Sequence, residues 1–305
     1  MRNHLPRIVA LLLALPLCLA ATQASAAVNV LACEPEWAAL ATEIGGERVK
    51  ASSATTGLQD PHRIEARPSL IARTRNADLL ACTGLELEVG WLPILLQQSG
   101  NTRIAAGQPG NFEAGSVVAR LDIPGRLDRS DGDVHAAGNP HIQQDPRNIL
   151  KVGEALSKRL ATIDPAGAPY YQSRYADFAG RWTTAMQKWE QQLAPLKGTA
   201  IVEHHKNMEY LMQWVGLKQV GTLEPKPGVE PSAAHLNALL GQLQKQPARM
   251  VIRAAYQDGR ASEWLAQHAK IAAVVLPFTV GGNEQAKDLF SLFDDTVARL
   301  LDGAK

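Results

Sequence analysis

The sequence carries little net charge, few cysteines and only one long apolar run, and these shortages exclude several classes of protein. A net charge of +1 argues against a nucleic-acid partner, which would require a concentrated basic face. Glycine (24 residues) and proline (18 residues) are near average usage, which excludes a fibrous or low-complexity class. The 305 residues are 46% apolar, so the chain suffices for one large or two ordinary folded domains.

The one long apolar run lies within residues 1–26. Arg2 and Arg7 precede it, and the small residues 24–26 (Ala-Ser-Ala) supply a cleavage pattern. These features are typical of a secretory signal peptide. Pro16 interrupts the run, which is already too short to span a membrane comfortably. We therefore expect a soluble protein that is exported to the periplasm.

The three cysteines leave alternatives open. Cys18 lies within the apolar run, and the preceding Leu17 is larger than the small residue that a lipid-attachment motif prefers. Cys33 and Cys82 each close a short apolar run, so they could sit at neighbouring strand ends, and an oxidising compartment permits a disulfide there. Two buried thiols fit the pattern equally well. A pair so far apart in sequence makes a poor metal site.

Short apolar runs alternate with helical periodicity in both halves of the chain. The expected strands are 28–33, 49–53, 78–83, 199–203, 220–223, 249–254 and 272–276. The expected helices are 37–44, 68–75, 91–99, 208–215, 232–244, 262–268 and 285–301. This alternation predicts βαβ units and parallel sheets, whose short apolar strands are buried on both faces.

Between residues 146 and 196 the pattern changes to long helices. One apolar face, with residues recurring at steps of three or four, predicts a helix of about seven turns. Its members are Tyr171, Tyr175, Phe178, Trp182, Met186, Trp189, Leu193 and Leu196. Such an aromatic stripe is more typical of core packing than of a cofactor site. Pro195 and Gly198 end the helix.

The simplest architecture for these elements is α/β, with two parallel-sheet lobes joined by one long rigid helix. We expect an N-terminal lobe at 27–150, a linking helical region at 151–197 and a C-terminal lobe at 198–305. Ligands of such folds bind outside the carboxyl ends of the parallel strands. A binding site is therefore expected in the cleft between the lobes.

Three loops at this cleft carry histidines. His62 follows the second strand, His141 precedes the long helices, and His204 and His205 directly follow the first strand of the second half. Proline stands before His62 and before His141, where it stiffens the backbone. Zinc accepts such neutral imidazoles in a tetrahedron, with a carboxylate or water as the fourth ligand. Any single histidine at a loop end is more often a surface or capping residue.

Short motifs surround these histidines. In chain order they are Asp60-Pro61-His62 with Pro68-Ser69, Ala77-Asp78-Leu79 with Thr83-Gly84 and Leu87-Glu88, Gly138-Asn139-Pro140-His141 with Asp145-Pro146, and His205-Lys206 with Tyr210 and Gly216-Leu217. Each motif alone is weak evidence, but the ordered set covers nearly all of residues 28–301. In this set the chain resembles the periplasmic metal-binding components of zinc and manganese ABC transporters.

The resemblance implies two α/β lobes bridged by a rigid helix, metal capture in the cleft and docking on a membrane permease. It implies His62, His141 and His205 as the histidine ligands. The pairing with Lys206 favours His205 over His204, and consecutive residues that leave a strand point in different directions. We expect a monomer that works with an ABC permease, with a periplasmic zinc metallochaperone as an optional further partner and no nucleic acid.

The sequence departs from the family pattern at two places, and the first leaves the fourth metal ligand unassigned. Relatives often place an acidic ligand in the loop after the last strand, but residues 276–282 contain no carboxylate. Water or Glu224 is then the expected fourth ligand, and a surface acid in a turn is the alternative for Glu224. The second departure is at residues 126–137, which lack the long histidine-rich insert of many zinc-binding relatives. This segment is either a polar loop, a weak capture site or a contact for a metal-delivering partner. The acidic residues and the histidine of the segment are Asp128, Asp131, Asp133 and His135.

Ligand hardness favours Zn²⁺, because imidazole suits zinc and copper whereas manganese prefers more oxygen ligands. The leading hypothesis is a high-affinity zinc receptor that delivers Zn²⁺ to an importer permease and is not an enzyme. An exported zinc-dependent hydrolase that uses an open fourth coordination position is the rival. The sequence contains neither His-Glu-x-x-His nor Gly-x-Ser-x-Gly. An adhesin-like surface protein with the same fold is a third hypothesis.

Overall fold

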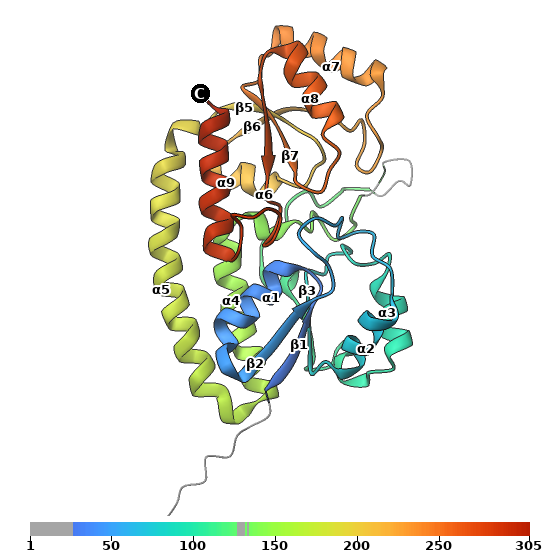
Figure 1. The fold of residues 1–305 in the computed structure, drawn as a ribbon, viewed down its shortest axis with the longest axis vertical. Helices are drawn as coiled ribbons and strands as arrows, with labels where there is room; N and C mark the ends of the chain where they lie inside the picture. The colour runs from blue at the N-terminus through green and yellow to red at the C-terminus, as the bar shows by residue number, and fades with distance from the viewer. Residues whose placement is uncertain (1–26, 127–131, 133) are drawn as a thin grey trace, which may run out of the picture.

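Two four-stranded parallel sheets form the centres of two lobes (Figure 1). The strands are β1 (Val28–Ala32), β2 (Val49–Ser53), β3 (Leu79–Cys82), β4 (Asn111–Glu113), β5 (Ala200–Glu203), β6 (Lys218–Thr222), β7 (Met250–Ala254) and β8 (Ala272–Leu276). The strand orders are β2-β1-β3-β4 and β6-β5-β7-β8, so the two lobes repeat one topology. All pairings are parallel, which confirms the predicted fold class.

This computed structural model describes residues 27–126, 132 and 134–305. The signal peptide expected at residues 1–26 lies outside the described residues, as do Asp128, Asp131 and Asp133. Within the described ranges, no helix combines the length and the apolarity that crossing a bilayer requires.

The helices follow the sequence prediction to within a few residues. They are α1 (Pro35–Gly45), α2 (Pro68–Asn76), α3 (Leu92–Ser99), α4 (Pro146–Ile163), α5 (Ala168–Leu193), α6 (Glu209–Val215), α7 (Ala233–Lys245), α8 (Arg260–Ala269) and α9 (Leu289–Gly303). The last helix was expected from residue 285 but begins at 289. Asp288 caps it by accepting a hydrogen bond from Ser291 N at 2.8 Å, and Ser291 completes a capping box.

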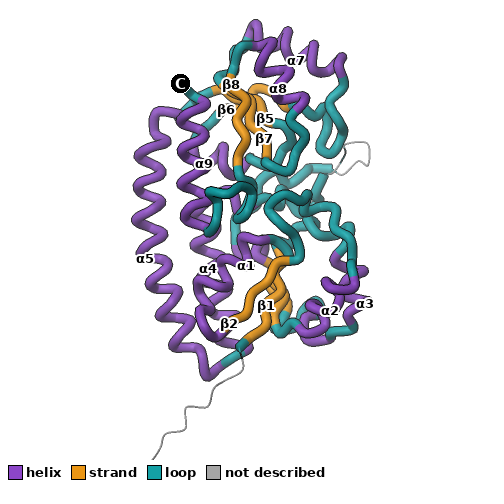
Figure 2. The backbone as a smooth tube through the Cα atoms, in the orientation of Figure 1, coloured by secondary structure: helices purple, strands orange, loops and turns teal. Residues whose placement is uncertain are grey.

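Helix α5 runs beside both lobes and joins them (Figures 1 and 2). Its 26 residues span about 39 Å. It packs on α1 and α4 of the N-terminal side and on α9 of the C-terminal lobe. Trp182 is fully buried, with its ring centroid 5.2 Å from that of Phe178 and 5.5 Å from that of Phe293. The aromatic stripe is therefore core packing, as expected from its spacing.

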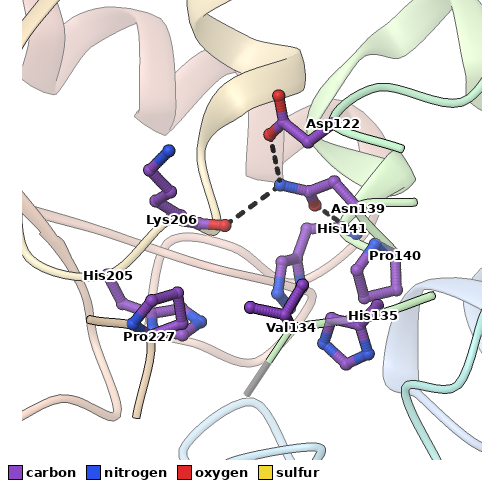
Figure 3. Close-up of a pocket in the computed structure, with 9 residues that line it drawn as sticks. All are labelled: Asp122, Val134, His135, Asn139, Pro140, His141, His205, Lys206 and Pro227. Carbon is purple, nitrogen blue, oxygen red and sulfur yellow. Dashed lines mark hydrogen bonds between the residues drawn. The ribbon is translucent and has the colours of Figure 1, made fainter. Parts of the chain in front are cut away.

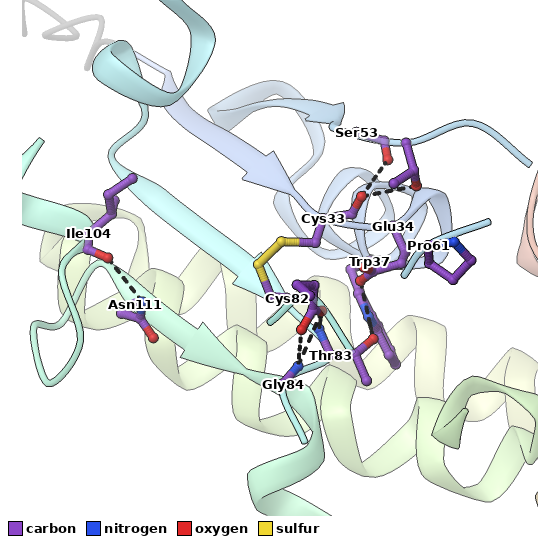
Figure 4. The surroundings of a disulfide bond; sticks show 12 residues. Cys33, Glu34, Trp37, Ser53, Pro61, Cys82, Thr83, Gly84, Ile104 and Asn111 are labelled. Atoms are coloured by element: carbon purple, nitrogen blue, oxygen red, sulfur yellow. Dashed lines mark hydrogen bonds between the residues drawn. A yellow bond between two sulfur atoms is a disulfide. The ribbon is translucent and has the colours of Figure 1, made fainter. Parts of the chain in front are cut away.

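A disulfide joins Cys33 to Cys82 at the carboxyl ends of the neighbouring strands β1 and β3 (Figure 4). The two Cα atoms are 4.7 Å apart, and Cys33 N donates to Ala81 O at 2.9 Å. Of the two alternatives for these cysteines, the structure shows the bonded pair. The disulfide links β1 to β3 at the carboxyl edge of the N-terminal sheet.

The loop that follows β8 connects the lobes directly. Gln144, just before α4, donates from Nε2 to Phe278 O at 2.7 Å, and the Thr279 hydroxyl donates to the Glu36 carboxylate. A Cβ added to Gly57 would lie 2.4 Å from the carbonyl carbon of Gly281. Only glycine at position 57 therefore permits this approach of the two loops. The lobes meet in backbone-to-backbone contact beside the cleft.

Candidate metal centre

Three histidine-bearing loops converge between the lobes. The His62 ring centroid lies 5.3 Å from that of His141 and 5.9 Å from that of His205, and His141 and His205 are 6.0 Å apart. Imidazoles bound through nitrogen to one tetrahedral zinc ion have centroids about 5.2 Å apart. The three rings thus stand within about 1 Å of the spacing that a single shared ion requires.

A carboxylate holds the outer nitrogen of two of these rings. Asp60 Oδ1 accepts a hydrogen bond from His62 Nδ1 at 2.7 Å, and Glu224 Oε2 accepts one from His205 Nδ1 at 2.7 Å. Such pairs fix the proton on Nδ1 and leave Nε2 as the metal-binding atom. His62 Nε2 is buried without a hydrogen-bond partner among the described residues, so its lone pair is available to a metal ion.

His141 is the most deeply buried ring of the centre, at 1% exposure. Burial lowers its pKa well below the ordinary value, and the neighbouring His62, His205 and His135 rings lower it further. The ring therefore stays neutral, with a lone pair ready for a metal ion. Its Nδ1 is buried and has no hydrogen-bond partner within the described part of the chain.

The loop that carries His141 is anchored to the C-terminal lobe by Tyr210 and Lys206. The Tyr210 hydroxyl donates to Asn139 O at 2.9 Å and accepts from Leu121 N at 3.1 Å. Asn139 Nδ2 donates to Lys206 O at 3.1 Å, while its Oδ1 accepts from His141 N at 3.1 Å. The Gly-Asn-Pro-His motif thus positions the buried His141 ring, because Asn139 forms hydrogen bonds that link the two lobes.

A cavity of about 230 Å³ lies beside these rings (Figure 3). Its lining residues are Asp122, Val134, His135, Asn139, Pro140, His141, His205, Lys206 and Pro227. Residues of both lobes contribute to it, so the expected location between the lobes agrees with the geometry.

The two histidines of the doublet face different spaces. His204 lines a separate cavity with Glu230, Asp258 and Arg260, and its Nε2 lies 3.9 Å from Glu224 Oε1. Burial lowers the His204 pKa. His205 is the member of the pair that joins His62 and His141.

Glu224 lies behind the His205 ring. Besides holding His205 Nδ1, its Oε2 accepts a hydrogen bond from Gly228 N at 2.7 Å. Residues 277–282, directly after β8, contain no carboxylate, and the Thr279 hydroxyl in this stretch donates to Glu36. The assignment of Glu224 as a metal ligand stays a prediction.

His135 is a member of the centre that the sequence left without a defined role. Its ring centroid lies 5.3 Å from that of His62 and 6.3 Å from that of His141. One ligand atom from each of His62, His135 and His141 lies within 4.8 Å of the others. In the sequence, His135 stands out only as a lone histidine shortly before the Gly-Asn-Pro-His motif. Its distance to the other rings depends on the path of the loop, which the sequence pattern does not predict.

Curated relatives include proteins named for zinc and proteins named for manganese. The zinc-binding lipoprotein AdcA of Streptococcus pneumoniae (strain ATCC BAA-255 / R6) is 24% identical over 215 residues, which are 68% of this chain and 40% of AdcA. The manganese ABC transporter substrate-binding lipoprotein PsaA of Streptococcus pneumoniae is 21% identical over 306 residues, 97% of this chain and 96% of PsaA. This chain therefore spans less than half the length of AdcA and nearly all of PsaA.

Solved structures share the two-lobed fold. The crystal structure of ZnuA has a TM-score of 0.76 at 21% identity and covers 92% of this chain and 100% of that one. The Mn-bound periplasmic metal binding protein from Candidatus Liberibacter asiaticus has a TM-score of 0.73 at 15% identity, with 91% and 100% covered. The model of the ZnuA family, described as zinc-uptake complex component A, periplasmic, matches residues 30–303, and this chain belongs to that family.

Proposed function

We propose that the protein is a periplasmic zinc receptor, which captures Zn²⁺ between its lobes and delivers it to the permease of an ABC importer. The observation that carries the proposal is the convergence of His62, His141 and His205 at the ring spacing of one tetrahedral ion. The buried, partnerless ring nitrogens of His62 and His141 within the described residues support it.

The donor set favours zinc over manganese. Three neutral imidazoles are nitrogen donors of intermediate softness, whereas Mn²⁺ is better served by carboxylate, carbonyl and water oxygens. The relatives bear both zinc and manganese in their names, so the choice depends on this chain's own ligands. Residues 277–282, directly after β8, contain no carboxylate, so this stretch offers no carboxylate oxygen of the kind that manganese would use.

Zinc capture requires deprotonated imidazoles, and negative charge near the rings favours a bound dication. Burial of Asp60 opposes its ionisation, but the hydrogen bond and charge of His62 outweigh that effect and lower the Asp60 pKa. Asp60 therefore stays negatively charged behind His62, and it compensates the charge of a bound dication. Protons compete with the metal, so affinity falls as the pH drops through the histidine range.

The remaining expectations follow from this function. A signal peptide at residues 1–26 delivers the chain to the periplasm, and the units are the lobes 27–150 and 198–305 with the helical link 151–197. The protein acts as a monomer on a membrane permease, and a zinc metallochaperone is a possible donor. It is not an enzyme, and the comparisons lend no support to a hydrolase.

The ligand assignment predicts a sharp contrast between histidines. His62→Ala, His141→Ala and His205→Ala should each weaken zinc binding by about 100-fold or more, because each removes a nitrogen donor from the ion. Titration of metal-free protein against a chromogenic chelator measures this.

The matched controls are His235→Ala and His268→Ala. His235 donates from Nε2 to Thr222 O at 2.9 Å, and His268 stacks on Trp264 with centroids 4.1 Å apart. Both lie in the C-terminal lobe, on α7 and α8, and the contacts of their rings are not with the histidines of the centre, so their removal should leave zinc affinity unchanged. Equal losses from all five substitutions would overturn the assignment.

A further inference from the structure

We propose that His135 supplies the fourth ligand, so that the bound zinc ion is held by four imidazoles rather than by three and a water or a carboxylate. The inference rests on the proposed function, because it concerns the same ion. It assigns a role to a loop residue that neither the motifs nor the family resemblance supplies.

The ring geometry places His135 within reach of the shared ion. Among the four histidines, five of the six ring pairs have centroid distances between 5.3 and 6.3 Å. The ligand atoms of His62, His135 and His141 lie within 4.8 Å of one another. A tetrahedral zinc shell needs nitrogens about 3.3 Å apart, so inward shifts of up to about 1.5 Å, within the range of side-chain rotation, bring these three nitrogens to one ion. The His205 ring lies outside this group of three and joins it through its centroid distances to His62 and His141.

The backbone around His135 is tied to both lobes. Ala136 N donates to the Glu86 carboxylate of the N-terminal lobe, and Gly138 N donates to His135 O at 3.1 Å. On the other side, Gly132 lies so close to Pro227 of the C-terminal lobe that an added Cβ would stand 2.2 Å from Pro227 O. These contacts hold His135 between the segment that carries Glu224 and the loop that follows β3.

His135 lines two cavities at once. It borders the cavity of about 230 Å³ together with His141 and His205, and a second cavity of about 360 Å³ together with His62. Figure 3 shows the rings of His135, His141 and His205 around the first of these spaces, with Val134 among them. The His135 ring would therefore lie against an ion placed among the four rings.

The charges around the rings suit an all-imidazole shell. Four neutral imidazoles would leave the two positive charges of zinc uncompensated in a buried site. Asp60 and Glu224 each place one carboxylate 2.7 Å behind a ligating ring, at His62 and His205, and together they balance the ion through the imidazoles. In this arrangement Glu224 positions the His205 ring and is not itself a ligand of the ion.

The test compares the wild type with His135→Ala and His135→Asp. We expect X-ray absorption of the zinc-loaded wild type to show four imidazoles, and that of His135→Ala to show three imidazoles and one oxygen. His135→Ala should lose about 100-fold in zinc affinity and little in manganese affinity. His135→Asp should move the zinc-to-manganese ratio towards manganese, because it exchanges a nitrogen ligand for oxygen. His268→Ala is the control that keeps all ligands.

The outcomes separate this inference from the proposed function. Unchanged zinc affinity in His135→Ala, with an oxygen already present in the wild-type shell, would overturn the role of His135. The proposed function would still stand if His62→Ala then lost binding, and it would fail if His62→Ala did not. Equal melting temperatures of metal-free wild type and His135→Ala show that the substitution acts on the ion and not on the fold.

Discussion

Each of the two lobes contributes one histidine to the centre whose ring is hydrogen-bonded to a carboxylate. Asp60 and His62 stand two positions apart in the N-terminal lobe, whereas Glu224 reaches His205 across the end of β6. In each pair the carboxylate holds Nδ1 as the donor, so that Nε2 keeps the lone pair that a metal ion would bind. Each lobe thus delivers one pre-oriented ring, and His141 lies between them.

These pairs predict an intermediate loss for the carboxylate variants. Asp60→Asn and Glu224→Gln should each weaken zinc binding by about 10–100-fold, because the rings lose orientation and basicity but remain ligands. Chelator competition gives the affinities, and X-ray absorption gives the donor count.

A change in donor count distinguishes positioning from ligation at Glu224. If Glu224→Gln removed an oxygen from the first shell and weakened binding as much as His205→Ala, Glu224 would be the fourth ligand and not the positioning residue. An unaltered shell with a modest loss agrees with the geometry.

At the residue scale, the sequence predicted the rings that have a local signal. His62 and His141 follow prolines, and His205 follows a strand end beside His204, so each position could be inferred from its own neighbours. The contact between Glu224 and His205 depends on how β6 ends, and the place of His135 depends on a loop path. Local pattern carries no information on either.

At the scale of elements, α1 and the loop after β8 meet through a buried carboxyl group. Glu36 is 1% exposed and accepts a hydrogen bond from Thr279 across the lobes. Burial raises its pKa to about 7, even though the Thr279 hydrogen bond favours the charged form. Glu34 and Glu88 lie nearby, and burial raises their pKa values as well.

This raised pKa predicts a pH-dependent cost at the junction. The unfolded chain releases the Glu36 proton near pH 4.5, but the folded protein keeps it until about pH 7. The group's contribution to stability is therefore fully present below pH 4.5 and is lost as the pH rises through 7. Glu36→Gln should raise the free energy of unfolding at pH 8 by about 1–3 kcal/mol and leave it unchanged near pH 4.5.

Denaturant unfolding of both metal-free proteins at the two pH values measures this difference. The difference between variant and wild type isolates Glu36 from His141, whose lowered pKa acts in the opposite direction. A variant that is less stable at pH 8 than the wild type would mean that ionised Glu36 stabilises the junction.

The predicted elements succeeded where a strand is a short, fully buried apolar run. Strand β3 is buried along its whole length, and its pattern was sufficient to find it. Strand β4 was missed, because its three residues contain only one buried apolar side chain, Phe112, and are too few to form a recognisable pattern. The start of α9 was missed by four residues, because the Asp288 capping box rather than the apolar pattern fixes it.

At the scale of the molecule, α5 limits how the lobes can move. It packs against α1 and α4 on one side and α9 on the other, so wide separation of the lobes would break the aromatic cluster around Trp182. The loop after β8 adds direct contacts between the lobes. We therefore expect metal capture and release to involve small tilts and loop changes.

The central claim is that the histidine rings between the lobes form one zinc-selective site. Its most direct test is titration of the metal-free mature protein with Zn²⁺ against a competing chelator, with Mn²⁺ measured in parallel. The account predicts one tightly bound zinc ion per chain and negligible binding of manganese. Zinc binding that is absent or only micromolar, or manganese bound as tightly as zinc, would contradict it.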